Sequence, residues 1–336
     1  MRDIRASDID KQLRLRAVLL RYLLNFPDER AFRRAQGLMD RFQRGRLAKG
    51  IRCEETAIRR KADGTPLRVL VYKSPSPSPE DGAAGLLWIH GGGYAMGLPE
   101  SDHGFCRRFV DAASCVIVSP DYRLSIHAPY PAALDDCYEA LVWMKENARA
   151  LGVRDDQLFV GGDSAGGGLT AATTLLARDR GEVSVAFQMP LYPMIDDRMN
   201  TDSATDNCAP VWNSRSNRAA WQLYLAGLFG TDEVPKYAAP AREQDYSRLP
   251  PTFTFVGGIE PFRDETRAYV DNLRSAGVPV GFAEFKGCYH AFEQMCPDAD
   301  VSRKAVAMLM DAFKHAVAHR FAAQPAVTSD PPRAKT

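Results

Sequence analysis

The chain has 336 residues, enough to bury a large hydrophobic core in one α/β domain or in a domain with a smaller module. Its apolar share of 45% and charged share of 25% are ordinary for a globular protein. The net charge of +1 gives no overall field that would draw it to nucleic acid or anionic membranes. The seven scattered cysteines show no paired CxxC spacing, which argues against a zinc site or disulfide framework and predicts a reducing compartment.

The first 50 residues show helical periodicity, with arginines between the apolar positions. A broad apolar face comprises Leu13, Leu15, Val18, Leu19, Tyr22, Leu23 and Leu24. A second arginine-rich helical pattern runs from Glu29 to about Arg46. Basic amphipathic helices can bind membrane surfaces or nucleic acids. The overall charge balance instead favours helices that pack over the main domain and keep their arginines in solvent.

No targeting or membrane-spanning segment is predicted near the N-terminus. The apolar run Val18-Leu19-Leu20 is soon broken by Arg21, whereas a signal peptide or a spanning helix needs a longer uninterrupted run. We therefore expect a cytoplasmic protein with no stable membrane insertion and no nucleic-acid partner.

From Ile51 onward, apolar β-rich runs alternate with helical patterns. Two strands within 51–72 flank a turn at 62–66, and the proline-rich segment 74–79 indicates an exposed surface loop. Further strands are predicted at 85–90, 115–119, 157–162, 184–189, 252–258 and 279–285, and helices at 132–148, from Leu169 and at 305–321. This alternation predicts an α/β fold with a mostly parallel, doubly wound sheet and helices on both faces.

One stretch joins a strand to a helix through a glycine cluster with a serine at its tip. The pattern Gly162-x-Ser164-x-Gly166 fits a nucleophile elbow. Small residues two positions either side of Ser164 let the strand and the helix close up, and the helix start favours developing negative charge. A glycine-rich turn in an ordinary α/β protein, or a weak phosphate loop, would give the same pentapeptide. The rest of the chain must decide between them.

A second glycine cluster, Gly91-Gly92-Gly93, follows the strand that ends at His90. Glycines there let the backbone pass close to a ligand and aim its N–H groups inward. In acyl transfer, one such donor lowers the barrier by about 3–4 kcal/mol. We expect the N–H groups of Gly92, Gly93 and Ala165 to form this oxyanion hole. His90 is expected to brace the loop through hydrogen bonds rather than to transfer protons.

Four motifs together resemble the hormone-sensitive-lipase-like branch of the α/β-hydrolases, bacterial esterase family IV. They are His90-Gly91-Gly92-Gly93-Tyr94, Asp121-Tyr122-Arg123-Leu124, Pro129-Tyr130-Pro131-Ala132-Ala133-Leu134-Asp135-Asp136 and Gly162-Asp163-Ser164-Ala165-Gly166-Gly167. The resemblance covers roughly 68–317, and the Gly-Asp-Ser-Ala-Gly form of the elbow points to the corresponding subgroup. The chain departs from the family at 125–128, where relatives carry Ala-Pro-Glu-His. We expect a loop there that changes local packing and leaves the catalytic set intact.

The resemblance implies the remaining catalytic groups residue by residue. Relatives carry Asp-Pro-Leu-x-Asp-Glu after a late strand, and Glu260 stands where their triad aspartate does. Glutamate can still hold an imidazole in the useful tautomer, so Glu260 is favoured over Asp264, whose counterpart is a structural residue of the next helix. His290 follows another late strand and completes the order Ser, acid, His of α/β-hydrolases.

The predicted domain organisation has three parts. Residues 1–50 form an N-terminal helical cap segment, 51–321 an α/β-hydrolase catalytic domain, and 322–336 a flexible tail. In the family, an insertion at the place of 193–240 joins the N-terminal helices as a cap over the site. Its aromatic residues, among them Trp212, Trp221 and Tyr224, are expected to pack in the core or the cap rather than to contact ligand.

These residues predict a serine esterase that works through an acyl-enzyme, with Ser164, Glu260 and His290 as its triad. The resemblance implies short-to-medium acyl carboxylic esters as its substrates, and the sequence itself does not resolve the chain length. The expected partner is a small-molecule ester, and a homodimer stays open. No cofactor is expected, and no metal, since His315 and His319 lack an HExxH-type acid between them. The alternatives are a non-catalytic small-molecule receptor on the same fold, a lactonase or amidase, and a lipid-surface lipase, for which an apolar lid has only modest support.

Overall fold

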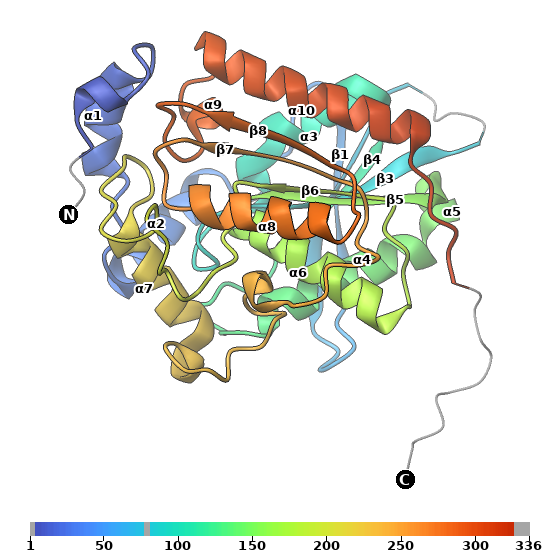
Figure 1. Ribbon diagram of the computed structural model, residues 1–336. Coiled ribbons are helices and arrows are strands. Elements are labelled where there is room, and N and C mark those ends of the chain that lie inside the picture. Colours follow the sequence, from blue (N-terminus) through green and yellow to red (C-terminus); the bar gives the residue numbers. More distant parts are fainter. Residues whose placement is uncertain (1–3, 77–80, 326–336) are drawn as a thin grey trace.

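The computed structural model describes residues 4–76 and 81–325, which form a twisted eight-stranded sheet covered by helices (Figure 1). The strands are β1 (Arg52–Arg59), β2 (Pro66–Lys73), β3 (Ala83–Ile89), β4 (Val116–Pro120), β5 (Val153–Asp163), β6 (Phe187–Leu191), β7 (Thr252–Gly257) and β8 (Val280–Phe285). Their order across the sheet is β1-β2-β4-β3-β5-β6-β7-β8. Strand β2 pairs antiparallel with β1 and β4, and the pairs from β4 to β8 are parallel. The predicted mostly parallel sheet is therefore confirmed.

The helices occupy the crossovers and the two ends of the chain. They are α1 (Arg14–Leu23), α2 (Glu29–Phe42), α3 (His103–Ala113), α4 (Ala132–Glu146), α5 (Ala148–Leu151), α6 (Ala165–Arg180), α7 (Ser214–Leu225), α8 (Arg263–Ser275), α9 (Phe292–Met295) and α10 (Asp300–His319). Short 3₁₀ turns lie at Ala6–Asp8, Pro99–Asp102, Ala226–Leu228 and Pro240–Arg242. Helices α3 and α10 cover one face of the sheet, and α4, α6 and α8 cover the other (Figure 1).

The central strands explain why the sheet is buried on both faces. Every residue of β3 is buried, and its run Leu86-Leu87-Trp88-Ile89 is continuously apolar, as expected when helices cover both sides. Strand β3 lies between β4 and β5. The chain leaves β3 through α3 to reach β4 on one side, and it leaves β5 through α6 to reach β6 on the other side. This is the topological switch point where α/β sheets bind ligands. The pairing of Ile89 with Gly162 sets the ends of β3 and β5 side by side there.

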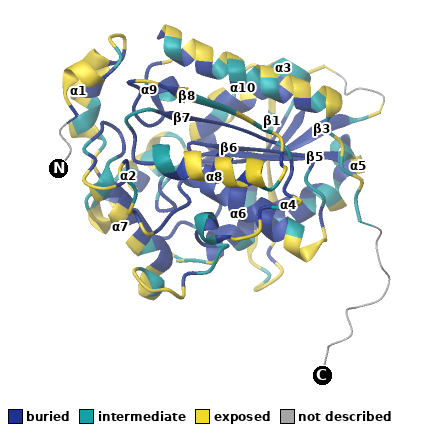
Figure 2. Cartoon of the chain, in the orientation of Figure 1, coloured by how far each residue is buried: buried dark blue, intermediate teal, exposed yellow. Residues whose placement is uncertain are grey.

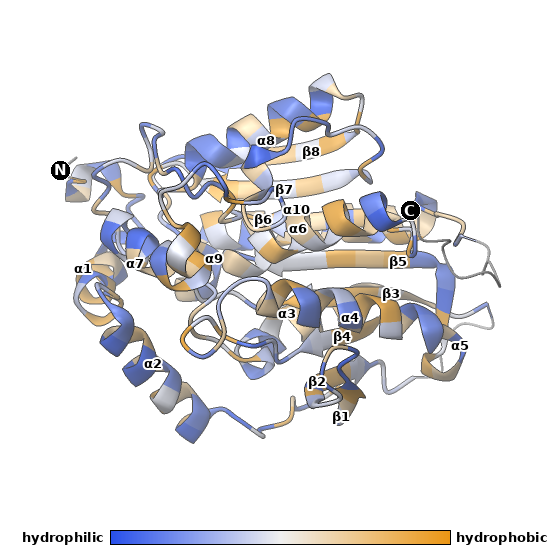
Figure 3. Ribbon diagram, turned by 90° about the horizontal axis from the view of Figure 1, so that it is seen from below, coloured by the Kyte–Doolittle hydropathy of each residue, from blue (hydrophilic) through white to orange (hydrophobic). Residues whose placement is uncertain are grey.

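Helices α1, α2 and α7 gather at the carboxyl end of the strands (Figures 1 and 3). The ring of Phe26, which precedes α2, stacks on Phe32 at 5.3 Å and lies 6.2 Å from Trp212. The Phe26 N–H also donates to Ser216 Oγ of α7 at 3.1 Å. The N-terminal segment and the insertion around α7 thus form one cap, which we call the helical cap.

The packing predicted for the first helix is wrong for most of its apolar face. Leu13, the residue just before α1, and Ala17 within it are buried, and Leu20 packs partly against the same cluster. The other row, Leu15, Val18, Leu19, Tyr22 and Leu23, is between 60% and 86% exposed. Figure 2 shows this helix as predominantly exposed. The helix carries two apolar rows at helical spacing, and the chain packs only one of them against the domain.

Two other segments differ in detail from the prediction. Strand β6 begins at Phe187 and not at Ser184, whose N–H donates to the Gln324 side chain at 3.0 Å. The Ala322 N–H donates to the Asp156 carbonyl at 2.8 Å, so the first residues of the predicted tail lie against the domain. The rest of that tail, 326–336, and residues 77–79 of the proline-rich segment lie outside the described residues.

Within residues 4–76 and 81–325, no helix combines the length and the apolarity that crossing a bilayer requires. All seven cysteines lie within the described residues, and none of them forms a disulfide there.

Candidate active site

Ser164 occupies a strained turn between β5 and α6. Its φ of 58° and ψ of −119° lie in a region that non-glycine residues rarely adopt. The turn is held by Ser164 N–H donating to Leu191 O and by Met194 N–H donating to Ser164 O, both at 3.0 Å. A Cβ at Gly162 or Gly166 would collide with the Ile89 carbonyl, which explains the two small residues flanking the serine.

Three side chains from distant parts of the sequence form one hydrogen-bonded row. His290 Nε2 lies 2.8 Å from Ser164 Oγ, and His290 Nδ1 makes a short contact with Glu260 Oε2. Glu260 is fully buried, and its Oε1 accepts the Gly257 N–H at 2.6 Å. With Nδ1–H donating to the glutamate, Nε2 is free to accept the serine proton. This arrangement can activate a hydroxyl nucleophile.

Asp264, the rival acid, has different partners. Its Oδ2 accepts the Ser203 N–H at 2.8 Å, and its carboxylate pairs with Arg263. The arginine and these hydrogen bonds hold the Asp264 pKa below its usual range, although partial burial opposes this. Its side chain therefore ties α8 to the segment at Ser203, away from the imidazole.

The glycine loop after β3 faces the serine from the other side. Gly92 and Gly93 both have positive φ, 118° and 61°, which glycine adopts without strain. A Cβ at Gly92 would collide with the Met96 carbonyl, and one at Gly93 with the Trp212 ring. Among the described residues, no hydrogen bond occupies the N–H of Gly92 or Gly93. The Ala165 N–H opens helix α6, where amides have no partner within the helix.

His90 is buried beneath this loop. Its Nδ1 lies 2.8 Å from Gly91 O, and its ring stacks on Tyr122 at 4.2 Å. The Tyr122 hydroxyl donates to His90 O at 3.0 Å, and Arg123 next to it pairs with the buried Asp136. Burial lowers the pKa of His90, so the ring stays neutral. The histidine and the tyrosine thus hold the loop in place.

Buried carboxyl groups behind the serine escaped the sequence analysis, apart from Asp163 of the elbow motif. Asp163 Oδ2 accepts Gln294 Nε2–H at 2.8 Å, while Trp88 Nε1–H donates to Asp102 Oδ2 at 2.7 Å. Burial raises the pKa of Asp163, and it raises that of Asp102 well above its usual range with a further contribution from the Asp163 charge. Glu293 is also buried, and burial raises its pKa to about 8 despite the hydrogen bond from Tyr192. In the sequence, the only indication that Glu293 lies near the site was its position three residues after His290.

Glu293 should make stability depend on pH. The folded protein keeps this carboxyl protonated up to about pH 8, whereas the unfolded chain ionises it near the ordinary value of 4.5. The unfolded state therefore binds fewer protons in this window, and the free energy of unfolding falls as pH rises from about 4.5 to about 8. Glu293→Gln keeps an acceptor for Tyr192 and removes the ionisation. The difference in free energy of unfolding, variant minus wild type, should therefore be about 1–3 kcal/mol more positive at about pH 8.5 than at about pH 5.

Urea unfolding at these two pH values checks this expectation. Glu233→Gln, at an exposed position, serves as the control and should leave the pH dependence unchanged. An identical pH dependence in the wild type and Glu293→Gln would show that the Glu293 carboxyl does not resist ionisation.

A cavity of about 770 Å³ opens above the serine, between the hydrogen-bonded row of Ser164 and His290 and the helical cap. Ser164, His290 and Gly92 line its floor, and Trp212 lines its wall. The apolar side chains contributed by the N-terminal segment are Leu23, Leu24, Phe26, Ala35, Leu38, Met39 and Phe42. The aromatic residues of the insertion divide as follows: Trp212 faces the cavity, whereas Trp221 and Tyr224 are buried against Tyr94. Of the predicted packing aromatics, Trp212 is thus also a cavity residue.

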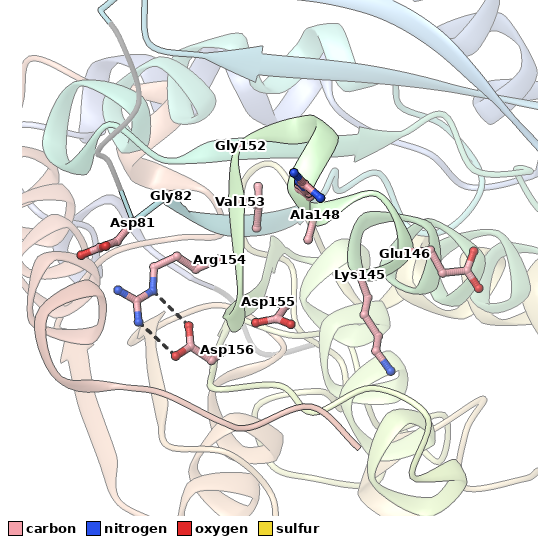
Figure 4. Close-up of a pocket in the computed structure, with 11 residues that line it drawn as sticks. Asp81, Gly82, Lys145, Glu146, Ala148, Gly152, Val153, Arg154, Asp155 and Asp156 are labelled. Atoms are coloured by element: carbon pink, nitrogen blue, oxygen red, sulfur yellow. Dashed lines mark hydrogen bonds and ion pairs between the residues drawn. The ribbon is translucent and has the colours of Figure 1, made fainter. Parts of the chain in front are cut away.

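A slightly larger hollow, about 840 Å³, lies beside α5 and the start of β5 (Figure 4), at the end of the molecule away from α1 and α2 (Figure 1). Its lining is charged, and Arg154 pairs there with Asp156. It holds none of the predicted site residues, so we place the candidate site at the smaller, apolar cavity. His315 and His319 lie exposed on α10, and the described residues contain no cluster of three or more metal-ligating side chains.

Comparison with known proteins finds sequences and solved structures that are similar to this chain. A family model described as alpha/beta hydrolase fold matches residues 86–294. The chain is 33% identical over 228 residues to esterase LipI of Mycobacterium tuberculosis, covering 68% of this chain and 71% of that protein. It is 32% identical over 256 residues to carboxylesterase NlhH of the same species, covering 75% and 79%. The solved structure of a bacterial heroin esterase superposes with a TM-score of 0.84 at 30% identity, covering 93% of this chain and 98% of that one.

Proposed function

Because the chain belongs to the α/β-hydrolase family, in its hormone-sensitive-lipase-like branch of carboxylic-ester hydrolases, we propose that it works as a serine esterase with Ser164, His290 and Glu260 as its triad. The observation that carries the proposal is the row in which His290 Nε2 lies 2.8 Å from Ser164 Oγ while Nδ1 contacts Glu260. This row stands beneath an apolar cavity large enough for a small ester.

In the first half of the reaction, His290 Nε2 takes the Ser164 proton as Oγ attacks the ester carbonyl. The tetrahedral intermediate carries a negative charge on the former carbonyl oxygen. The N–H groups of Gly92, Gly93 and Ala165 are the proposed donors to that oxygen. His290 then gives its proton to the departing alcohol, which leaves the acyl group on Ser164.

In the second half, a water molecule replaces the alcohol. His290 Nε2 takes a proton from this water, whose oxygen attacks the acyl carbonyl, and the proton returns to Ser164 Oγ as the acid leaves. Glu260 balances the imidazolium in both halves and keeps Nδ1 protonated. The chemistry needs no metal or organic cofactor.

The lining of the cavity supports a proposal about the substrate class. Its wall is mainly aliphatic and aromatic, from Leu24, Met96, Val211 and Trp212, which favours an uncharged acyl or alcohol group. We propose esters of short-to-medium acids as substrates. The relatives named esterase and carboxylesterase support this class.

Hydrolysis of a matched series tests the substrate assignment. The purified protein would be assayed with p-nitrophenyl esters from acetate to palmitate, an anilide of the preferred acid, and a lactone. We expect the highest kcat/KM among the short-to-medium esters. If a lactone or the anilide is hydrolysed faster than every ester, the protein is a lactonase or an amidase and not an esterase. If the protein binds these ligands but hydrolyses none of them, the non-catalytic receptor is favoured.

A further inference from the structure

The apolar row that α1 leaves in solvent reaches the mouth of the cavity. Leu15, Val18, Leu19 and Tyr22 are exposed and do not line the cavity, whereas Leu23 at the end of the row is exposed and does. Exposed apolar surface that is continuous over several large side chains marks an interaction site more often than a solvated face.

Helix α2 contributes further exposed apolar side chains to the cavity. Leu38 and Phe42 are more than half exposed and also line the cavity. They share one helical row with Arg34 and Arg30, because residues four apart lie on the same face. Exposed apolar side chains of both helices therefore lie at the cavity above Ser164, and those of α2 share a row with arginines.

The charge of the helical segment differs sharply from that of the rest of the chain. Residues 11–50 contain eleven Lys and Arg against three Asp and Glu, a net charge of +8, while the whole chain carries +1. The remaining residues therefore carry −7. Arg30 and Arg34 are exposed and form no ion pair within the described part of the chain. Exposed cations without acidic partners leave this face open to an anionic surface.

We propose that the outer faces of α1 and α2 dock the protein on a lipid surface with anionic headgroups, with the cavity mouth turned toward the lipid. The apolar side chains of α1 would enter the boundary between headgroups and acyl chains, and the arginines would contact the phosphates. A second copy of the chain is a poorer occupant, because an isologous dimer through this face would bring two cationic segments together.

Docking in this orientation gives an ester dissolved in the lipid a direct route into the cavity. The docking itself does not depend on the triad, so it goes beyond the proposed function and is tested separately. Full-length Ser164→Ala is the protein to use, because it should bind vesicles without hydrolysing their esters.

Cosedimentation with vesicles tests the proposal. The vesicles would be pure phosphatidylcholine, or phosphatidylcholine with about one-third phosphatidylglycerol. We expect binding to the anionic vesicles that weakens about tenfold or more when salt is raised from about 0.05 M to about 0.5 M. Two double variants, made in the Ser164→Ala protein, separate the contributions. Leu15→Gln/Leu19→Gln and Arg30→Gln/Arg34→Gln should each weaken binding about tenfold or more.

The matched control is Lys145→Gln/Arg149→Gln, which removes two charges that line the charged hollow beside α5 and should bind as the parent does. The same substitutions with Ser164 restored should keep hydrolysis of a soluble short ester, which shows that the variants fold. Absence of binding to anionic vesicles at low salt would overturn the proposal. A loss of vesicle binding in the control as large as that in the two double variants would also overturn it. A dimer in solution that Leu15→Gln/Leu19→Gln dissociates, without vesicle binding, would assign the surface to a second copy.

Discussion

Replacing Ser164 by alanine is expected to lower kcat/KM for a short p-nitrophenyl ester by about four to six orders of magnitude. The loss should be this large because Oγ lies 2.8 Å from His290 Nε2, and among the described residues no other hydroxyl is hydrogen-bonded to that nitrogen. Steady-state kinetics over a range of enzyme concentrations measures the effect. Substrate affinity should change little, since the cavity walls and the glycine loop remain.

Ser101→Ala is the matched control for this variant. Ser101 also lines the cavity, but its hydroxyl donates to Gln43 in the cap segment and not to the imidazole. The control should keep kcat/KM within about tenfold of the wild type. Retention of most activity in Ser164→Ala would mean that the nucleophile has been assigned to the wrong residue.

Replacing Glu260 by glutamine is expected to lower kcat by about three to four orders of magnitude. Glu260 accepts two hydrogen bonds, from Gly257 N–H at Oε1 and from His290 Nδ1–H at Oε2. A glutamine must present its NH₂ group to one of them. Facing His290, it forces the tautomer with the proton on Nε2, which cannot accept the serine proton. If the NH₂ group faces Gly257, it cannot accept the Gly257 N–H, and two hydrogen-bond donors point at each other.

Asp264→Asn provides the comparison for the acid. Because Asp264 binds Ser203 and Arg263, its loss should lower the free energy of unfolding by about 1 kcal/mol and leave kcat within about tenfold of the wild type. Measuring kcat and urea unfolding for both variants separates the two roles. A larger loss of kcat in Asp264→Asn than in Glu260→Gln would reverse the assignment of the acid.

The sheet and the elbow could be predicted because their signals are local. A continuous apolar run such as Leu86-Leu87-Trp88-Ile89 has few alternatives to a buried strand, and the spacing around Ser164 reflects sterics within five residues. Glu260 lies 30 residues before His290, and His290 lies 126 residues after Ser164. These two residues could therefore be identified only through the motifs that surround them.

The remaining features depend on tertiary packing that local patterns do not encode. Helix α1 carries two apolar rows, and the sequence does not indicate that the domain covers only the row of Leu13 and Ala17. The raised pKa of Glu293 arises from burial by elements far apart in the chain. Trp212 lines the cavity because Gly93, more than 100 residues earlier, has no side chain to exclude it.

Labelling with a p-nitrophenyl alkylphosphonate tests the central claim most directly, because the reagent phosphonylates only an activated nucleophile. Intact-mass and peptide mass spectrometry should find one equivalent on Ser164, no label in Ser164→Ala, and labelling slowed by about three orders of magnitude or more in His290→Ala. Label on another residue, or an unchanged rate in His290→Ala, would contradict the triad.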